Sequence, residues 1–463
     1  MTEPTEPTES TETTEHHKTP VKATIASWVG TTLEYYDFAV YATASALVFN
    51  VIFFPPELPE GVRLMLSLAT LGVGYLVRPL GAFILGPIGD RYGRKFVMLL
   101  TLFGIGACTF LIGCLPTFHD IGIWAPILLV LIRMIQGLSV SGEQAAAITM
   151  TLEHSPDNRR AFTTSFVTSG SAAGGLLSTA IFIPFVALPQ EQLMSWGWRV
   201  PFWLSAVVVI VAYIIRRTLE EPPAFIETQA VEVSLSPLKQ ALQFHWGSII
   251  RIALCAMVAG VSYMFATFSV AFATTGYKLD RPTMLWVPVL ASLLALVYTP
   301  VAGLLADKIG RRTVFAIGAA GAAVSTAPYL WAITQGNWPL IFALGILCNG
   351  FFYSTANAAW PAFFAEMFPN RVRVSGLAVG TQIGFALSGA IAPIIATALA
   401  GNDVTMWVGP SIFAIALGGL AAAAALTAKE TARRTLDEID DLQQSDREKA
   451  AVAAATVSSP APA

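Results

Sequence analysis

The chain has 463 residues, of which 55% are hydrophobic and only 12% are charged, and its mean hydropathy is +0.63. About 25% of the residues of a soluble domain are charged, so this composition excludes an ordinary soluble protein. The net charge of −3 excludes no further class of protein, because the placement of charges matters more than their sum in a membrane protein. Long apolar runs predict membrane-spanning helices rather than a β-barrel.

Taken in order, the chain begins with a polar tail and continues as a series of apolar spans. Residues 1–20, with the run TEPTEPTESTETTE, are expected to form a disordered cytoplasmic tail. About 20 residues are needed per span, so the length allows about twelve transmembrane helices. We predict them at 24–49, 64–85, 96–115, 124–152, 162–188, 200–217, 247–275, 284–306, 314–333, 340–368, 374–399 and 406–427.

Polar segments divide these spans into two sets of six. Residues 218–245, which contain EEPPAFIE, are predicted to be a cytoplasmic linker between an N-terminal half, 21–217, and a C-terminal half, 246–428. Residues 429–463 are predicted to be a cytoplasmic tail. We interpret its charged part as a solvated end rather than an oligomerising coil, because it is too short for sustained heptads.

The basic residues predict the orientation. With the N-terminus in the cytoplasm, most loop lysines and arginines lie inside, and only Arg63, Arg199, Lys278 and Arg281 fall outside. The sequence therefore predicts a multi-pass protein of the inner (cytoplasmic) membrane with both termini cytoplasmic.

The first span carries two carboxylates, Glu34 and Asp37, within an apolar segment. A charge at the membrane centre costs roughly 3 kcal/mol on insertion scales, so such residues are normally functional. A spacing of three residues places both on one helical face. Other predicted spans of this half contribute Arg78, Arg133 and Glu143.

Helix depth suggests two layers in this five-charge cluster. Counted at 1.5 Å per residue, Asp37 and Arg133 lie nearest the middle, and Glu34 or Glu143 lies level with Arg78. Three acids face two bases, so one acid lacks a basic partner and is expected to take up a proton readily. A static ion-pair cluster that only fixes helix packing is the alternative.

The C-terminal half has no charged residue away from the ends of its spans, but it has polar and aromatic ones. Asn349, Tyr353 and Asn357 recur at four-residue spacing and share a helical face. Their polar groups need partners at membrane depth, which either a cavity or a neighbouring helix would supply. We take these three residues together with Tyr263, Trp360 and Gln382 as candidate substrate ligands.

An internal repeat relates the two halves. The segment that starts at Gly86 and contains Asp90 and Arg94 returns as the segment that starts at Gly303 and contains Asp307 and Arg311. Glu153-His-Ser-Pro is likewise echoed by Glu366-Met-Phe-Pro. Two parallel halves of this kind are typical of transporters with a substrate site at the interface between the halves.

The Gly-x-x-x-Asp-(Arg/Lys)-x-Gly-Arg-(Lys/Arg) loop in both halves resembles the signature of the major facilitator superfamily. The first helix, Gly30-Thr-Thr-Leu-Glu34-Tyr-Tyr-Asp37-Phe, and Arg78-Pro-Leu-Gly resemble its metabolite:proton symporter family, with shikimate-type importers the most similar branch. The resemblance implies an all-α fold of twelve transmembrane helices in two pseudo-symmetric six-helix halves. It also implies that the fifth and eleventh helices face each other across the halves.

The same resemblance implies roles for individual residues. Asp90, Arg94, Asp307 and Arg311 would gate the cytoplasmic side, with positive-inside topology as the alternative. Asp37, or Glu34 if the two roles are exchanged, would carry the coupling proton. Protonation of Asp37 would release Arg133, which could then hold a substrate carboxylate with Arg78 as a second clamp. Glu143 is included among the substrate-binding candidates.

These expectations predict a secondary active transporter that imports a small organic acid with protons, and a shikimate-like hydroxy monocarboxylate is the favoured substrate. The alternatives are a di- or tricarboxylate such as 2-oxoglutarate or citrate, a betaine-type zwitterion, and a proton-coupled exporter. We expect no enzymatic activity, cofactor, metal or nucleic acid, and a monomer whose partners are an organic anion, protons and the lipid bilayer. The cysteines, all in apolar runs, are expected to be buried hydrophobes.

Overall fold

The computed structural model describes residues 20–186, 188–217, 236–401 and 404–444. The first six passes are α1 (Pro20–Ala44) extended by the π-helical η1 (Ser45–Phe49) and α2 (Asn50–Ile52), then α3 (Glu60–Tyr92), α4 (Arg94–Cys114), α6 (Trp124–His154), α7 (Arg160–Val186) and α9 (Arg199–Arg217). Short elements connect them: α5 (Phe118–Ile121), α8 (Gln190–Gln192) and η2 (Leu193–Gly197).

The second half repeats this plan after α11 (Pro237–Phe244). Its seventh pass is α12 (Trp246–Ala256), α13 (Ala259–Tyr263), η3 (Met264–Phe268), α14 (Ser269–Ala271) and η4 (Phe272–Gly276). There follow α15 (Arg281–Ile309), α16 (Arg311–Thr334), a tenth pass of α17 (Trp338–Gly345), η5 (Ile346–Tyr353) and α18 (Ser354–Ala365), the 3₁₀ turn η6 (Asn370–Val372), α19 (Arg373–Leu399), α20 (Val408–Leu426) and the short α21 (Leu436–Gln443).

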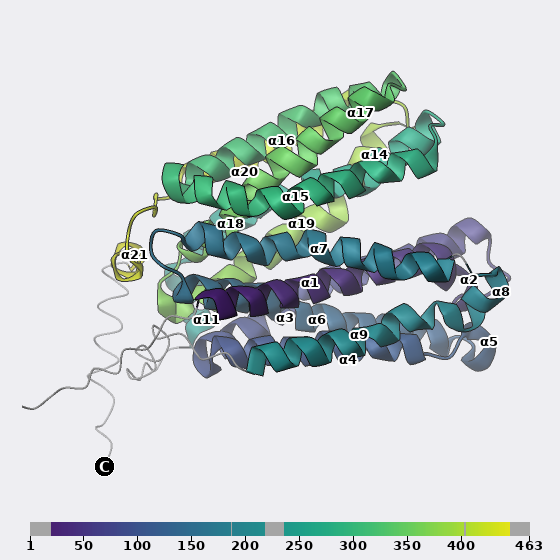
Figure 1. Cartoon of the computed structure of the whole chain (residues 1–463), viewed down its shortest axis with the longest axis horizontal. Coiled ribbons are helices and arrows are strands. Elements are labelled where there is room, and N and C mark those ends of the chain that lie inside the picture. Colours follow the sequence, from purple (N-terminus) through teal and green to yellow (C-terminus); the bar gives the residue numbers. More distant parts are fainter. Residues whose placement is uncertain (1–19, 187, 218–235, 402–403, 445–463) are drawn as a thin grey trace, which may run out of the picture.

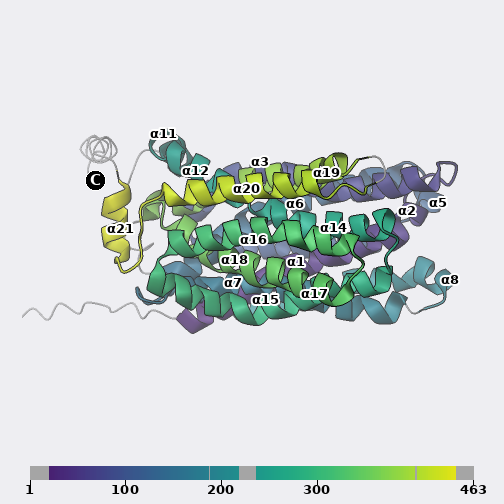
Figure 2. The ribbon, with the colours of Figure 1, turned by 90° about the horizontal axis from the view of Figure 1, so that it is seen from above.

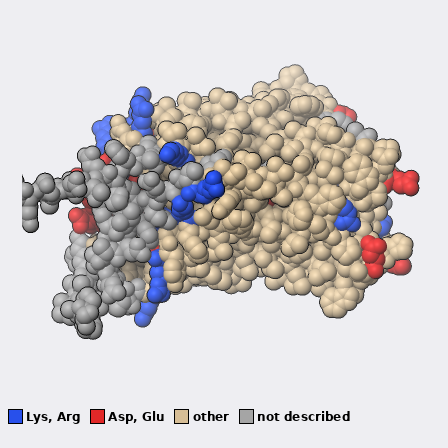
Figure 3. Space-filling model, turned by 60° about the horizontal axis from the view of Figure 1, so that its bottom comes forward, with Lys and Arg blue, Asp and Glu red and all other residues tan. Residues whose placement is uncertain are grey.

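The predicted all-helical membrane fold is confirmed. The described residues form helices and no strand, and each of the twelve predicted spans coincides with a helical pass. Eleven described helices are long and apolar enough to cross a membrane, and α1, which carries Glu34 and Asp37, is not among them. On the face in Figure 3, charged side chains gather at the two ends and a broad uncharged band lies between them.

The predicted termini and linker are only partly visible. Residues 1–19, 218–235 and 445–463 lie outside the described residues, but 237–244 of the expected linker form α11. Both described ends of the chain lie at the same end of the molecule, close to α21 (Figure 1). We call this the inner end, because the charge bias predicts it to be cytoplasmic, and the opposite one the outer end.

The two halves share a core at the inner end and keep separate cores elsewhere. One buried cluster combines residues of both halves, including Leu85 and Ile148 with Phe364 and Leu377. A second cluster lies wholly within 33–212, and a third wholly within 261–417. The helices of the two halves accordingly converge near α21 and diverge toward the outer end (Figure 1), and most of them run along the long axis (Figure 2).

Glycines of the internal repeat allow the sharp turns and the close contacts of the inner end. Gly93 and Gly310 have φ of 105° and 120°, a region that favours glycine, where the chain turns from α3 to α4 and from α15 to α16. A methyl group at Gly86 would come within 2.8 Å of the Ser375 Cα, and one at Gly303 within 2.8 Å of the Ala161 carbonyl oxygen. These glycines bring α3 against α19, and α15 against α7.

The expected contact between the fifth and eleventh helices is replaced by this cross-packing. Helix α7 packs against α1, α15 and α18, and α19 packs against α3, α6 and α12. Each therefore contacts the opposite half, but through a different helix from the one that the resemblance implied.

Candidate functional site

At the inner end, the repeat carboxylates cap helices of the opposite half. The Asp90 carboxylate accepts hydrogen bonds from the backbone N–H groups of Val374 (3.0 Å) and Ser375 (2.8 Å) in the first turn of α19. Asp307 accepts in the same way from Ala161 (3.0 Å) and Phe162 (2.9 Å) in α7. The first N–H groups of a helix lack partners within it and carry partial positive charge, so each carboxylate stabilises the contact between halves.

Two buried glutamates complete this network. Glu153 binds Arg94 (3.2 Å) of its own half and Arg373 (2.8 Å) of the other half. Glu366, which corresponds to Glu153 in the internal repeat, binds Arg311 (3.2 Å) of its own half and Arg160 (2.7 Å) of the other half. All these side chains are 0–1% exposed.

The four predicted gating residues all lie in this network, but sequence reasoning missed half of it. Arg311 also binds Asp307 (3.1 Å), and Arg94 lies 4.0 Å from Asp90. The missed residues are Glu153, Arg160, Glu366 and Arg373. The echo of Glu153 and Glu366 in the repeat was the signal that could have found them.

The prediction that the start of the C-terminal tail is a solvated end is wrong. Glu430 accepts from the backbone N–H of Arg311 (3.0 Å), and the Thr431 hydroxyl donates to Glu366. In α21, Asp440 binds Arg373 (2.8 Å). Burial raises the pKa of Asp440 above its ordinary value, although Arg373 opposes this. Residues 430–443 thus bind the network of both halves.

In the centre of the first half, the predicted pair of Glu34 and Arg78 is present. Their closest charged atoms are 3.6 Å apart, and both side chains are nearly fully buried. The Arg78 guanidinium carbon also lies 4.4 Å from the centre of the Phe38 ring and 4.6 Å from that of Tyr75. Arg78 is therefore held by one carboxylate and two rings.

Arg133 has a different environment. Its Nη1 donates to the Gln136 side-chain oxygen (2.6 Å), and its guanidinium carbon lies 4.4 Å from the Phe38 ring centre and 4.2 Å from that of Tyr41. Nε and Nη2 are buried without hydrogen-bond partners. Gly74 leaves room for the Arg133 guanidinium, because a methyl group at position 74 would come within 3.0 Å of Nε.

The expected direct ion pair of Asp37 and Arg133 is not among those of the described residues. Asp37 is 1% exposed, and neither carboxylate oxygen has a hydrogen-bond partner, although Arg133 is one of its electrostatic neighbours. Thr109 is another neighbour, but it donates its proton to the Ile105 carbonyl (3.0 Å) and accepts from Gln136 (2.7 Å). A buried carboxylate thus lies beside a buried guanidinium with free N–H groups.

Glu143 does not join the central cluster as predicted. Its carboxylate accepts a hydrogen bond from the Thr101 hydroxyl of α4. Arg78 pairs with Glu34 instead. Counting residues gives the position of Glu143 along the helix axis but not the direction in which its side chain points.

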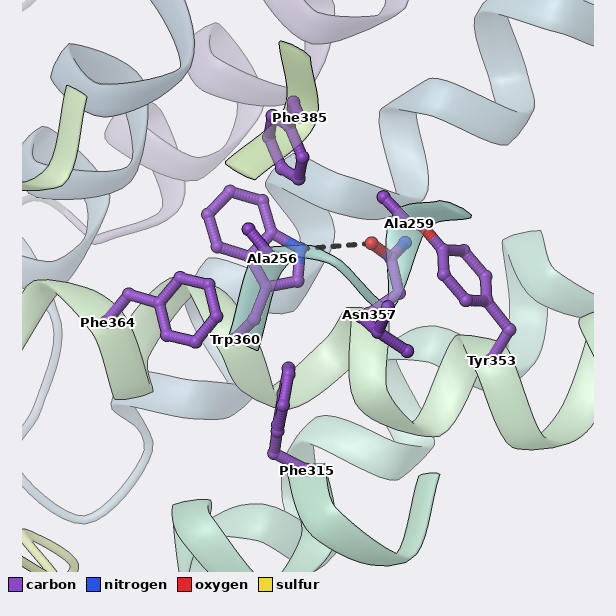
Figure 4. A pocket seen from close by; sticks show the side chains of 9 residues that line it. Ala256, Ala259, Phe315, Tyr353, Asn357, Trp360, Phe364 and Phe385 are labelled. Carbon is purple, nitrogen blue, oxygen red and sulfur yellow. Dashed lines mark hydrogen bonds between the residues drawn. The ribbon is translucent and has the colours of Figure 1, made fainter. Parts of the chain in front are cut away.

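In the second half, three of the predicted residues line one pocket (Figure 4). Tyr353, Asn357 and Trp360 surround it together with Ala256, Val258, Ala259, Phe315, Phe364 and Phe385. The Trp360 indole N–H donates to the Asn357 side-chain oxygen (3.0 Å), which fixes both groups. The π-helical segment η5 carries Tyr353, and such segments often occur at functional sites.

The other predicted residues of this half are more dispersed. Asn349 donates to Ser262 (3.2 Å), so helix–helix hydrogen bonding accounts for it. The Tyr263 ring lies 6.0 Å from that of Tyr75 of the first half, measured between centroids. Gln382 is 1% exposed, and its side-chain oxygen has no hydrogen-bond partner.

Aromatic residues join the two halves around Arg78, and sequence reasoning missed most of them. The electrostatic neighbours of Tyr263 are Arg78, Tyr35, Tyr75 and Tyr353. Tyr35, Tyr75, Tyr263 and Tyr353 are all partly exposed, and the Tyr75 and Tyr263 rings bring the two halves into contact. Tyr35 and Phe38 flank the two acids in the sequence, but a ring at such a position is equally compatible with an apolar core. Among the described residues, no group of three or more His, Cys, Asp or Glu side chains could hold a metal ion.

Comparison with known proteins supplies the family. The profile described as "Sugar (and other) transporter" matches residues 22–233, and that described as "Major Facilitator Superfamily" matches residues 252–458. The "Shikimate transporter" of Escherichia coli (strain K12) is 35% identical over 420 residues, covering 89% of this chain and 95% of the relative. A "Putative proline/betaine transporter" of Staphylococcus aureus (strain COL) is 34% identical over 389 residues, covering 82% of each.

Solved structures agree on the fold. The proton:xylose symporter XylE bound to 6-bromo-6-deoxy-D-glucose has a TM-score of 0.74 at 19% identity, covering 92% of this chain and 99% of that one. The inward open conformation of XylE from E. coli has a TM-score of 0.61 at 21% identity, covering 92% and 100%. The resemblance drawn from the motifs is therefore confirmed. The chain is a multi-pass membrane transporter, not an enzyme, and it belongs to the major facilitator superfamily.

Proposed function

We propose that this transporter imports a small organic acid together with protons by alternating access. The observation that carries the proposal is the juxtaposition of Asp37 and Arg133. Asp37 has no hydrogen-bond partner, and Arg133 has two buried N–H groups without one. A carboxylate buried in this way is most stable when protonated, and it can form an ion pair with its neighbour once it is ionised.

The two protonation states of Asp37 give opposite states of Arg133. With Asp37 neutral, the Arg133 fork is free to bind a substrate carboxylate through two N–H groups. With Asp37 ionised, the carboxylate competes for the same N–H groups and expels the anion. Proton and substrate therefore bind and leave together, as symport requires.

The second half supplies contacts for the uncharged part of the substrate. Tyr353, Asn357 and Trp360 line a pocket of about 10 Å³ in that half, which has room for no more than a water molecule in this state and would have to widen around a substrate. Tyr263 lies against Tyr75 of the first half. Phenol and amide groups can form hydrogen bonds with the hydroxyl groups of a hydroxylated ring. The relative named as a shikimate transporter supports a hydroxy monocarboxylate. The relative named as a putative proline/betaine transporter keeps a zwitterion as the second candidate, and a di- or tricarboxylate is the third.

Alternating access is supported by the asymmetry of the two ends. The inner end has a common core and a buried ion-pair network, whereas each half has its own core elsewhere. The structure thus corresponds to a state closed at the inner end. We take that end as cytoplasmic, with both termini inside the cell. Breaking the network and re-forming contacts at the outer end would then release substrate inward.

Transport by purified protein in liposomes tests the proposal. Shikimate, 2-oxoglutarate, citrate and betaine are offered with and without an inwardly directed proton gradient. We expect gradient-driven accumulation of shikimate, and accumulation that is abolished by a protonophore. Shikimate uptake that equilibrates without responding to the gradient would contradict symport. Accumulation of betaine alone would favour the second candidate.

A further inference from the structure

One aromatic ring, that of Phe38, contacts both Arg133, the neighbour of Asp37, and Arg78, the partner of Glu34. Its ring centre is 4.4 Å from the guanidinium carbon of Arg78 on α3 and 4.4 Å from that of Arg133 on α6. Among the described residues, Phe38 is the one ring that makes cation–π contacts with two arginines. Within the described part of the chain, Tyr75 makes a cation–π contact with Arg78 alone, and Tyr41 makes one with Arg133 alone.

The shared ring makes the positions of the two cations depend on each other. An aromatic face attracts a cation through its quadrupole, and the attraction is strongest where water is excluded, as around these buried arginines. Two like charges on one ring also repel each other, and Arg78 is an electrostatic neighbour of Arg133. When one guanidinium leaves the ring, the other is held there more tightly.

We propose that Phe38 is a positioning residue that transmits the protonation state of Asp37 to Arg78, and this inference rests on the proposed function. With Asp37 protonated, both guanidiniums share the ring, so Phe38 holds Arg78 less tightly and a substrate carboxylate competes only with Glu34 and Tyr75 for it. With Asp37 ionised, Arg133 moves to Asp37 and the ring retains Arg78 with Glu34. Protonation therefore makes both arginines available at once, which strengthens the coupling of proton and anion.

The charged and titratable side chains around Asp37 agree with this assignment. Asp37 interacts electrostatically with Glu34 and Tyr36 of α1, Cys108 of α4 and Arg133 of α6, and the Thr109 hydroxyl of α4 is a further polar neighbour. Arg133 is the one cation among them. Since Phe38 follows Asp37 directly and contacts that cation, movement of Arg133 toward Asp37 must change its contact with the ring.

Shikimate binding to the purified full-length protein in lipid nanodiscs, measured by calorimetry at pH 5.5 and pH 8, tests the inference. For the unmodified protein we expect affinity about tenfold higher at the lower pH, within the usual range of coupling between two sites. Phe38→Leu keeps an apolar side chain but removes the ring. It should reduce the ratio of the shikimate affinity at pH 5.5 to that at pH 8 to about twofold or less. Phe38→Trp keeps a ring and should retain the ratio.

The remaining variants and outcomes separate Phe38 from other causes. Phe103→Leu, at a 49% exposed ring of α4, is the matched control and should behave as the unmodified protein. An unchanged ratio in Phe38→Leu would overturn the inference. If that variant does not fold, loss of the ratio in well-folded Phe38→Trp would also overturn it. No pH dependence in the unmodified protein would contradict the proposed symport itself.

Discussion

The inner end and the centre of the first half both bury arginines, but they differ in how these arginines are paired. At the inner end, Arg94, Arg160, Arg311 and Arg373 each bind a buried glutamate, and Glu153 and Glu366 bridge the halves. In the centre, Arg78 lies beside Glu34, but within the described part of the chain Arg133 binds no carboxylate and Asp37 has no hydrogen-bond partner. Buried acids and arginines that are paired with one another favour one arrangement, whereas an unpaired acid and base leave a choice.

This difference suggests a division of roles. In the proposed cycle, the inner network would hold the two halves closed at the inner end. The central pair would respond to protonation, because the interaction of Asp37 with Arg133 depends on the charge of Asp37. Variants of the two regions should therefore fail differently: inner variants should shift the conformational balance, and central variants should uncouple protons from substrate.

The largest expected effect comes from Glu366→Ala. The substitution leaves Arg160 and Arg311 buried without this partner, and breaking a buried pair costs about 3–5 kcal/mol. We expect a marked fall in the thermal unfolding temperature and loss of uptake. Asp157→Ala is the control, because Asp157 is 45% exposed and binds the same Arg160. A stable, fully active Glu366→Ala protein would show that the network does not hold the inner end closed.

Asp90→Asn should have the next largest effect. Its oxygen can still accept one of the two N–H bonds from α19, but the negative charge at the helix N-terminus is lost. Such a charge contributes up to about 2 kcal/mol in a partly buried site, which corresponds to a shift of up to about thirtyfold in a conformational balance. We predict transport reduced to background with normal membrane insertion, measured by uptake and quantitative blotting. Uptake by Asp307→Asn should decrease in the same way. Normal uptake by Asp90→Asn would refute the gating role.

Asn357→Ala and Tyr353→Phe should have smaller effects, confined to substrate recognition. The first removes the acceptor of the Trp360 N–H, and one hydrogen bond contributes about 0.5–1.5 kcal/mol. We expect the KM for shikimate to rise about three- to tenfold, the change that this energy gives. The maximum accumulation driven by a proton gradient should stay the same. Loss of gradient-driven accumulation with unchanged KM would reverse the proposed division between the halves.

Asp440→Ala should have the smallest effect, since an ion pair that is partly exposed contributes at most about 1 kcal/mol. We expect faster amide hydrogen exchange in α21 and little change in uptake. Burial raises the pKa of Asp440, so the docked tail binds the proton more tightly than the free tail. Docking in the unmodified protein should therefore strengthen as the pH falls through that pKa, and the variant should lack this dependence. Unchanged exchange would contradict docking through Asp440.

Much of this architecture follows from local patterns. Eleven of the twelve spans were predictable because each is a long apolar run in the described part of the chain, and the halves because the Asp90 and Asp307 loops repeat. Helix depth placed Glu34 and Glu143 level with Arg78, and the structure shows that Glu34 is the one that pairs with it. The spans and the repeated loops can be recognised from short stretches of sequence, without any knowledge of how the helices pack.

The remaining features depend on partners distant in the sequence. The environment of Arg133 is set by Gln136 and by the rings of Phe38 and Tyr41, which hold the guanidinium without a carboxylate and leave its Nε and Nη2 without partners. Rotation about the helix axis, which depth counting ignores, turns Glu143 to Thr101. The tail segment has no apolar run, so nothing local predicts that Asp440 meets Arg373, 67 residues away.

The most direct test of the central claim is Asp37→Asn, measured by proton-driven accumulation and by substrate exchange in the same liposomes. Glu34→Gln is the matched control, because it neutralises the paired acid on the same face of α1. We predict that Asp37→Asn abolishes accumulation against a gradient but still exchanges substrate across the membrane. Full pH-driven accumulation by Asp37→Asn would contradict the account, and its loss in Glu34→Gln instead would transfer the coupling role to Glu34.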